Sequence, residues 1–140
     1  MSTPNTSTGL PSEAPVFIKV FLETGPDGRS RFREEVVPTR EVKPLLYLSA
    51  PVLGGNVVLR QSPPGYFMDF HPTTTAQWTF VLSGALQIGL PDGTKRVFRA
   101  GDVLYSTDIT PAGVTFDAKV HGHDSRVVSE EPVVAVLVRE

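Results

Sequence analysis

Three histidines and no cysteine leave imidazole as the group through which this sequence could bind a metal or move a proton near neutral pH. The absence of cysteine excludes disulfides, thiolate zinc sites and a cysteine nucleophile. His121 and His123 are two residues apart, so in a strand they would share one face, as a pair of metal ligands must. His71 precedes Pro72, which favours extended backbone at the histidine. The spacing leaves two interpretations open, a metal site or a hydrogen-bonded His71 with an exposed loop at 121–123.

Polar side chains close to His71 could complete such a site. Strand alternation along 77–82 puts Gln77 on one face and Trp78 on the other. Thr73 shares the face of His71 if the chain stays extended. Imidazoles that converge with an amide or a carboxylate in a barrel would suit Zn, Fe, Ni or Cu. The candidate metal ligands are therefore His71, Gln77, His123 and His121, and Gln77 and Thr73 are also candidate contacts for an organic ligand.

Three further residues have both a chemical and a structural interpretation. Asp69 is a candidate general base beside His71, or a side chain in solvent at the end of a strand. Tyr105 shares the parity of Val103, so its hydroxyl could act in the cavity as a catalytic group, or its ring could belong to the core. Asp108 could reach the mouth of the cavity and bind a ligand there, or form an Asx turn.

Short β-branched and aromatic runs, separated by Gly and Pro, indicate the elements that must position these residues. No window shows the apolar periodicity of a helix, and the 13 prolines also argue against long helices. Many short strands with turns between them predict an all-β sandwich or barrel, and Pro91-Asp92-Gly93 predicts a hairpin. The predicted strands are 16–22, 31–37, 45–49, 56–60, 65–71, 77–82, 85–90, 94–99, 102–106, 114–120, 125–128 and 133–139.

Length and composition limit the organisation of the chain. A length of 140 residues predicts one domain, at 16–140, after a Ser-, Thr- and Pro-rich stretch at 1–15 that we expect to be a disordered tail. A net charge of −2 without a basic patch argues against nucleic acid as a partner. No apolar run approaches the ~20 residues that span a bilayer, so we expect no membrane partner. The first residues lack the basic and apolar regions of a secretory signal, so we expect a cytoplasmic protein.

The spacing around His71 resembles the first motif of the cupin superfamily. Gly65, His71 and Gly84 match this motif, but Thr73 stands where the family has a second histidine and Gln77 where it has a glutamate. The stretch from 79 to 105 continues as cupins do, with a strand, a glycine turn, a hairpin and Gly101-Asp102 before the next strand.

The second cupin motif is also similar, with differences. Gly101-Asp102 opens it, Pro111-Ala112-Gly113 is displaced by extra residues, and His123 (or His121) stands for its histidine, while Val127 replaces the usual asparagine. Small one-domain cupins carry further similar segments, which here are His71-Pro72, Gln77-Trp78, Gly101-Asp102-Val103-Leu104 and 122–128. The resemblance covers about residues 56–138.

The resemblance implies a cupin-like jelly-roll β-barrel whose interior holds a divalent metal or a small ligand. Family metals include Fe, Zn, Ni and Mn, and family reactions include those of dioxygenases, isomerases and lyases. By this resemblance His71 and His123 map to metal ligands, Gln77 replaces the carboxylate ligand with a neutral amide, and His121 could compensate for the missing histidine.

Three functions therefore remain open from the sequence. The chain could be a metal-assisted enzyme acting on a small organic molecule, a metal-free barrel that binds a small molecule, or a structural dimeric barrel without catalysis. The segment 107–120 could cover the pocket as a lid, or it could pair as an extra strand. The long apolar strand predicted at 16–22 would be a poor free edge, so we expect a homodimer with this strand at or near the interface.

Overall fold

The computed structural model describes residues 17–52 and 54–140, and this part of the chain contains twelve strands and no helix. The tail predicted at 1–15 lies outside the described residues. None of the described segments is a helix long and apolar enough to cross a membrane. The strands are β1 (Ile18–Thr24), β2 (Ser30–Val36), β3 (Arg40–Lys43), β4 (Leu46–Leu48), β5 (Asn56–Ser62), β6 (Phe67–His71), β7 (Gln77–Ser83), β8 (Leu86–Gly89), β9 (Lys95–Phe98), β10 (Val103–Ser106), β11 (His123–Val127) and β12 (Val133–Arg139).

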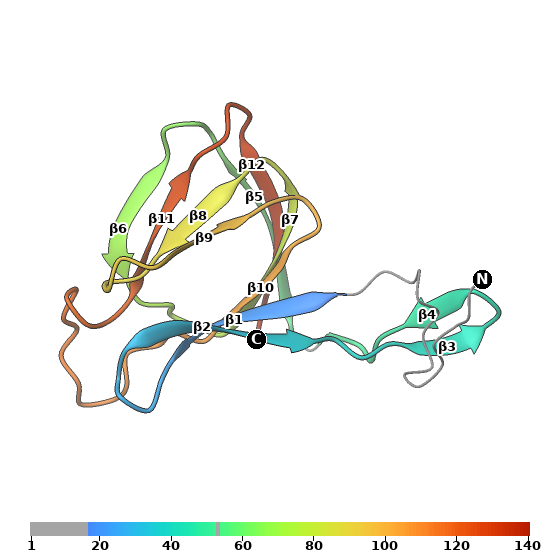
Figure 1. The fold of residues 1–140 in the computed structure, drawn as a ribbon, viewed down its shortest axis with the longest axis horizontal. Helices are drawn as coiled ribbons and strands as arrows, with labels where there is room; N and C mark the ends of the chain where they lie inside the picture. The colour runs from blue at the N-terminus through green and yellow to red at the C-terminus, as the bar shows by residue number, and fades with distance from the viewer. Residues whose placement is uncertain (1–16, 53) are drawn as a thin grey trace.

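Two sheets face each other and form the jelly roll (Figure 1). The six-stranded sheet has the order β2-β1-β10-β7-β12-β5, and the four-stranded sheet has the order β6-β11-β8-β9. β5 and β6 follow each other in the chain but each forms one edge of its own sheet. The interior is therefore bounded on one side by these two edges.

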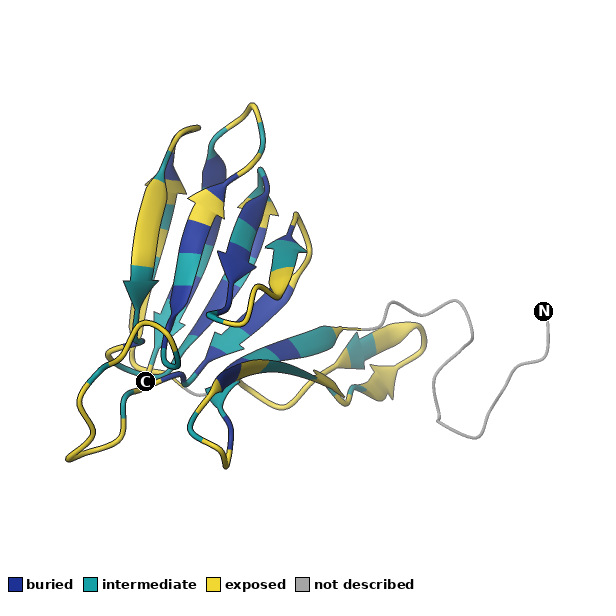
Figure 2. Cartoon of the chain, turned by 60° about the vertical axis from the view of Figure 1, so that its left-hand side comes forward, coloured by how far each residue is buried: buried dark blue, intermediate teal, exposed yellow. Residues whose placement is uncertain are grey.

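Alternation in the strands fills the space between the sheets with apolar side chains (Figure 2). In β12, Val133, Ala135 and Leu137 are buried, while the residues between them are partly exposed. Leu22 from β1 and Leu86 from β8 are almost completely buried in the same cluster. Burial of such side chains contributes on the order of 1.5–3 kcal/mol each, so this cluster is the main source of stability for the barrel.

The strand registers bring together residues that are distant in the sequence. His123 on β11 is the direct partner of His71 on β6. Gln77 on β7 lies between Ser106 on β10 and Arg139 on β12. The predicted hairpin at 91–93 is present, because β8 and β9 are antiparallel and Leu90 N donates to Thr94 O at 2.8 Å.

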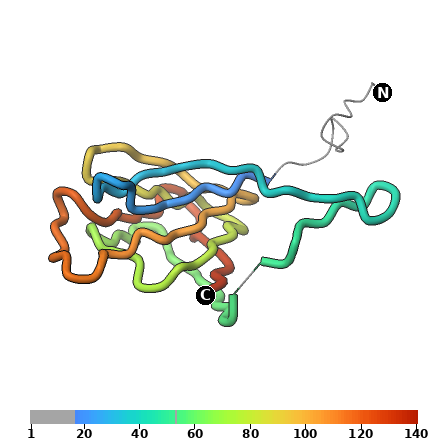
Figure 3. Tube along the Cα trace, turned by 90° about the horizontal axis from the view of Figure 1, so that it is seen from below, coloured from blue at the N-terminus to red at the C-terminus, as the bar shows by residue number. Residues whose placement is uncertain are grey.

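Two predictions about elements were wrong. Residues 114–120, predicted as a strand, form turns closed by bonds such as Val120 N to Asp117 O at 2.9 Å. Conversely, β3 was not predicted, because its sequence REVK lacks an alternating apolar pattern. β3 pairs with β4, and Figures 1 and 3 show this hairpin as an arm that extends away from the barrel.

Candidate functional site

A cavity of about 560 Å³ lies in the interior of the jelly roll, a size typical of pockets for small organic molecules. Its apolar wall comes from core residues such as Leu86 and Leu104. Its polar wall comes from strands of both sheets and from the segments on either side of β6. The polar side chains that line it are Arg60, Gln61, Tyr66, His71, Thr73, Thr74, Gln77, Thr79, Ser106, His123, Ser125 and Arg139.

His71 and His123 form a pair in this cavity. Their ring centroids are 4.6 Å apart and the rings are tilted by 57°. His71 Nδ1 lies 2.7 Å from the backbone oxygen of Asp69, and His123 Nδ1 lies 3.0 Å from Asp108 Oδ2. A carbonyl oxygen only accepts, so Nδ1 of His71 carries the proton. Both Nδ1 atoms are thus engaged, and the Nε2 atoms are the ones available to a ligand.

Asp108 holds His123 from behind the cavity wall. Its side chain is only 2% exposed, and it accepts hydrogen bonds from Thr24 Oγ1 at 2.8 Å and from Ser30 Oγ at 2.7 Å as well as from His123. Burial by itself acts to raise the pKa of Asp108, but the hydrogen bonds from His123, Ser30 and Thr24 outweigh burial and lower that pKa. The carboxylate is therefore ionised at neutral pH. Ser30 Oγ also accepts from Gly122 N at 2.9 Å, which ties the start of β11 to the same network.

The environment of His71 favours its neutral form. Burial lowers the pKa of this histidine, the bond to the carbonyl of Asp69 acts in the opposite direction, and the charge of Arg60 lowers the pKa further. A neutral imidazole with its proton on Nδ1 has a lone pair on Nε2. His71 can therefore accept a hydrogen bond or a proton from a bound molecule.

Thr73 and Gln77 line the cavity as expected, but the side chain of each is already hydrogen-bonded within the protein. Thr73 Oγ1 shares a hydrogen bond with Ser106 Oγ at 2.5 Å. Gln77 Oε1 accepts from Arg139 Nε at 3.1 Å. The alternation predicted for 77–82 is confirmed, since Gln77 and Thr79 line the interior whereas Trp78 lines a groove on the outer face of the sheet.

This donor set does not fit a resident divalent metal. Within the described residues, no group of three His, Cys, Asp or Glu side chains is placed to hold one ion. Beside the two imidazoles, the amide oxygen of Gln77 is already bonded to a guanidinium, which repels a dication, and Thr73 offers only a neutral hydroxyl. Asp108 is committed to His123 and does not line the cavity.

Two other candidate residues, Asp69 and Tyr105, are not brought to the histidine pair. Asp69 is exposed and its carboxylate accepts from Phe70 N at 2.8 Å, so only its backbone oxygen reaches His71. Tyr105 lies on the outer face of the six-stranded sheet, where its hydroxyl donates to Glu140 Oε2 at 2.7 Å. Burial, together with this carboxylate, raises the pKa of Tyr105 to about 12. The alternation of β10 explains the difference, because Leu104 and Ser106 are the inward residues.

His121 belongs to a turn rather than to the cavity lining. Its Nδ1 accepts from Asp117 N at 3.0 Å, and its backbone N donates to Asp117 O at 2.7 Å. The turn ends at Gly122, which adopts a φ of +84°. A Cβ at Gly122 would lie 2.8 Å from both His71 O and Phe116 Cε1. The absence of a side chain at Gly122 thus allows the loop to pack against the strand that carries His71.

Two arginines in the cavity were not among the predicted site residues. Arg139 follows the buried positions 133, 135 and 137 of β12, so its parity places it inside. Arg60 has the same parity as the buried Ser62 on β5. The alternation of these strands could have indicated both positions, but an arginine at the end of an apolar strand is usually interpreted as a solvent-exposed residue.

Several solved structures are distantly similar to this chain. No protein-family profile and no curated protein sequence matches the chain. Among solved structures, it is similar to a cupin 2 conserved barrel domain protein from Salinispora arenicola CNS-205, with 18% identity over 66% of this chain and 69% of that one and a TM-score of 0.42. It is also similar to the Schizosaccharomyces pombe Cnp3 cupin domain, with 13% identity over 91% of this chain and 89% of that one and a TM-score of 0.42.

The fold itself is all-β and jelly-roll-like. The chain is similar as well to Bacillus subtilis oxalate decarboxylase, a protein described with Mn(II) centres, at 24% identity over 60% of this chain and 21% of that one, with a TM-score of 0.37. Similarity of fold does not by itself indicate an activity, because one fold can host many unrelated functions. The chemistry of the cavity must therefore be argued from this chain's own residues.

Proposed function

We propose that this cupin-like barrel binds a small organic molecule in its interior cavity, in contact with His71 and His123. The observation that supports this most strongly is the fixed imidazole pair. Each ring is anchored through Nδ1 to an oxygen, which leaves two Nε2 atoms in a cavity of about 560 Å³ rich in hydroxyl groups. A concave cavity in which convergent polar groups face an apolar wall is typical of a ligand site.

The same geometry could support proton transfer. His123 and the ionised Asp108 form a pair in which the carboxylate fixes the imidazole orientation and would stabilise the imidazolium. His71 Nε2 could accept a proton from an acidic group of the ligand, because this imidazole is held in its neutral form. Catalysis of a proton transfer is therefore a function that this cavity could add to binding.

A thermal-shift screen of small organic acids, amides, alcohols and sugars tests the binding function, with analysis of the denatured protein for a released small molecule. We expect at least one compound to raise the melting temperature of the wild type. His123→Leu removes a polar contact with the ligand. It should therefore lower the affinity for this compound by about tenfold or more. His121→Leu is the matched control, because His121 lies outside the cavity lining. No released molecule and no stabilising compound would contradict the proposal.

The donor set favours a metal-free cavity over one with Fe, Zn, Ni or Mn. Two imidazoles and an amide that already binds Arg139 are a poor ligand set for a dication. We expect elemental analysis of protein purified without an affinity tag to show metal well below one equivalent. A stoichiometric metal that is lost in both His71→Ala and His123→Ala would instead support a metal-assisted enzyme.

We also propose that two copies of the chain associate through the outer face of the six-stranded sheet and the β3–β4 arm. Within one chain, the groove between this sheet face and the arm has a volume of about 1060 Å³ and contains Trp78, Phe80 and Leu48. Its size and apolar lining would suit a second protein surface.

A further inference from the structure

Arg60 presents a charged group to the cavity without a matching partner. Its Nε donates to Ser62 Oγ at 2.9 Å, and its guanidinium lies 5.1 Å from the centroid of the Tyr66 ring. These contacts fix the orientation of the guanidinium plane. Its Nη2 is nonetheless buried and has no hydrogen-bond partner in the described part of the chain. A buried cationic donor without a partner is costly, so such a group usually has a ligand, an ion or water to satisfy it.

The arginine side chains that line the cavity are not matched by acidic ones. Arg60 and Arg139 both line it, and Arg139 Nε is bonded only to the neutral amide of Gln77 among the described groups. No Asp or Glu is among the described residues that line this cavity. The nearby carboxylate of Asp108 is fully used by His123, Ser30 and Thr24. The cavity therefore offers two guanidinium groups and no anionic group of its own.

We infer that the molecule bound in this cavity is a small organic anion whose anionic group pairs with the guanidinium of Arg60. This inference rests on the proposed binding function and specifies the class of its ligand. The planar guanidinium of Arg60 presents donors in a geometry that matches the oxygens of a carboxylate or a phosphate. Arg139, whose Nε donates to Gln77 Oε1, contributes a second positive charge to the cavity lining.

The histidine pair complements this charge recognition. The Nε2 atoms of His71 and His123 are acceptors when the rings are neutral, so they suit a hydroxyl or another donor on the same ligand. The charge of Arg60 also reaches His71, whose pKa it lowers. An anion beside Arg60 would offset this effect. The class of ligand that satisfies both groups is an organic acid that carries a hydrogen-bond donor.

A series of matched probes tests the inference on the full chain by calorimetric titration and thermal unfolding. The probes are acetate and benzoate, their neutral amides acetamide and benzamide, and phenyl phosphate. We expect an acid to bind more tightly than its amide by about tenfold to a hundredfold, the usual effect of a charge-assisted hydrogen bond. Tighter binding of benzoate identifies a carboxylate as the anionic group, and tighter binding of phenyl phosphate identifies a phosphate.

Substitutions assign the effect to Arg60. Arg60→Met should remove the preference for acids over amides. It should also raise the melting temperature of the ligand-free protein, because it removes the buried Nη2 donor that has no hydrogen-bond partner among the described residues. Arg60→Lys keeps the charge but loses the planar group, so it should retain part of the preference. Arg126→Met is the matched control, since Arg126 also lies over an aromatic ring, 4.6 Å from the centroid of Phe67, but outside the cavity lining.

The outcomes separate this inference from the proposed function. If amides bind as tightly as acids, the cavity binds small molecules but the ligand is not an anion, and the inference is overturned. If no probe binds to the wild type, the inference is overturned. If a neutral sugar or alcohol then binds, the proposed binding function still stands without it. A preference for acids that persists in Arg60→Met and Arg60→Lys also overturns the role of Arg60.

Discussion

Single residues in the cavity show how anchoring and burial set the chemistry of an imidazole. His71 and His123 are both bonded through Nδ1, but one partner is a backbone carbonyl and the other is a buried carboxylate. The sequence motif predicted the positions of these two histidines in one site. It could not predict that Asp108 would lie behind His123, because that contact depends on the path of the loop after β10. It also could not show the unpartnered Nη2 of Arg60, which depends on side-chain orientation.

The lowered pKa of His71 predicts a dependence of stability on pH. The folded state keeps this histidine neutral to a lower pH than the unfolded chain, so between the two pKa values the unfolded state binds more protons. Stability is then highest above the unfolded value of about 6.5 and falls as the pH drops through the lower folded pKa. We expect His71→Asn, which can still donate to the Asp69 carbonyl, to flatten this part of the curve.

Chemical denaturation at a series of pH values between about 5 and 8 measures this effect, since the range brackets the unfolded histidine pKa. His121→Asn is the control, because it retains His71 and should keep the slope. An unchanged slope in His71→Asn would show that another group carries the dependence.

At the scale of strands and loops, prediction worked where alternation and turn residues agreed. The β8–β9 hairpin was predicted from Pro91-Asp92-Gly93, and β12 from its run of apolar, mostly β-branched residues. The segment 114–120 looks like a strand because of its Val and Phe residues, but its turns leave it outside both sheets. β3 has the opposite character, since pairing with β4 gives a strand to a sequence that is exposed throughout. Local pattern thus fails where pairing partners decide the structure.

The loop between β10 and β11 predicts a specific sensitivity at Gly122. An alanine there would adopt an unfavourable φ of +84° and place its Cβ 2.8 Å from the backbone oxygen of His71. Gly113→Ala has a similar φ of +81° with open space around the new Cβ, so it measures the backbone effect alone. We expect Gly122→Ala to lower the free energy of unfolding by roughly 1–3 kcal/mol more than Gly113→Ala.

Urea denaturation of the two variants compares their free energies of unfolding, and nuclear magnetic resonance of the histidine side chains reports on the pair. The signals of His71 and His123 should shift in Gly122→Ala and remain in place in Gly113→Ala. Equal destabilisation with unchanged histidine signals would mean that the loop does not support the pair.

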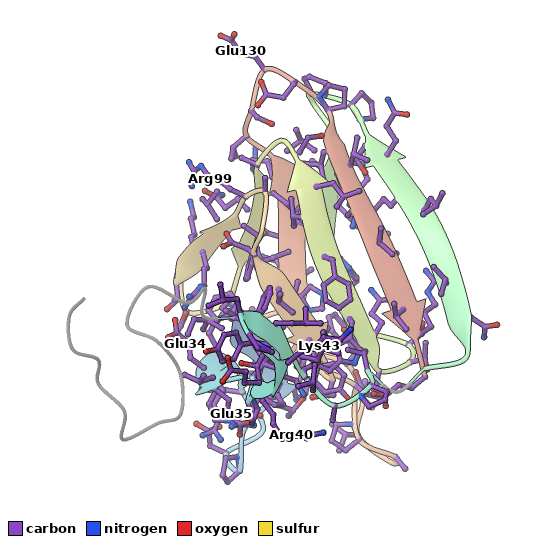
Figure 4. All side chains as sticks on the ribbon, turned by 90° about the vertical axis from the view of Figure 1, so that its right-hand side faces the viewer. Glu34, Glu35, Arg40, Lys43, Arg99 and Glu130 are labelled. Atoms are coloured by element: carbon purple, nitrogen blue, oxygen red, sulfur yellow. The ribbon has the colours of Figure 1, made fainter. Side chains whose placement is uncertain are left out.

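The whole molecule combines the predicted barrel with an arm that the sequence did not predict. The all-β class and the jelly roll are confirmed, because alternation, turn residues and strand spacing indicate the same architecture as the two facing sheets. Figure 4 faces the end of this arm, with Arg40 and Lys43 of β3 labelled on it. Its apolar residues have little to cover them within one chain, since Leu45 is 86% exposed and Leu48 is 51% exposed.

These features predict that the arm of one copy packs in the outer groove of the other. The groove contains Trp78 and Phe80 as an apolar floor, with charges of both signs at Glu35 and Arg40. Because two copies related by a twofold axis make each contact twice, one charged substitution in the arm disrupts both halves of the interface.

We expect sedimentation velocity to show a dimer for the wild type and a monomer for Leu48→Glu. Val114→Glu, on an exposed loop away from the groove lining, is the control and should remain dimeric. A monomeric wild type would refute the proposed dimer, and a dimeric Leu48→Glu would place its interface elsewhere, for example at the exposed edge strand β5.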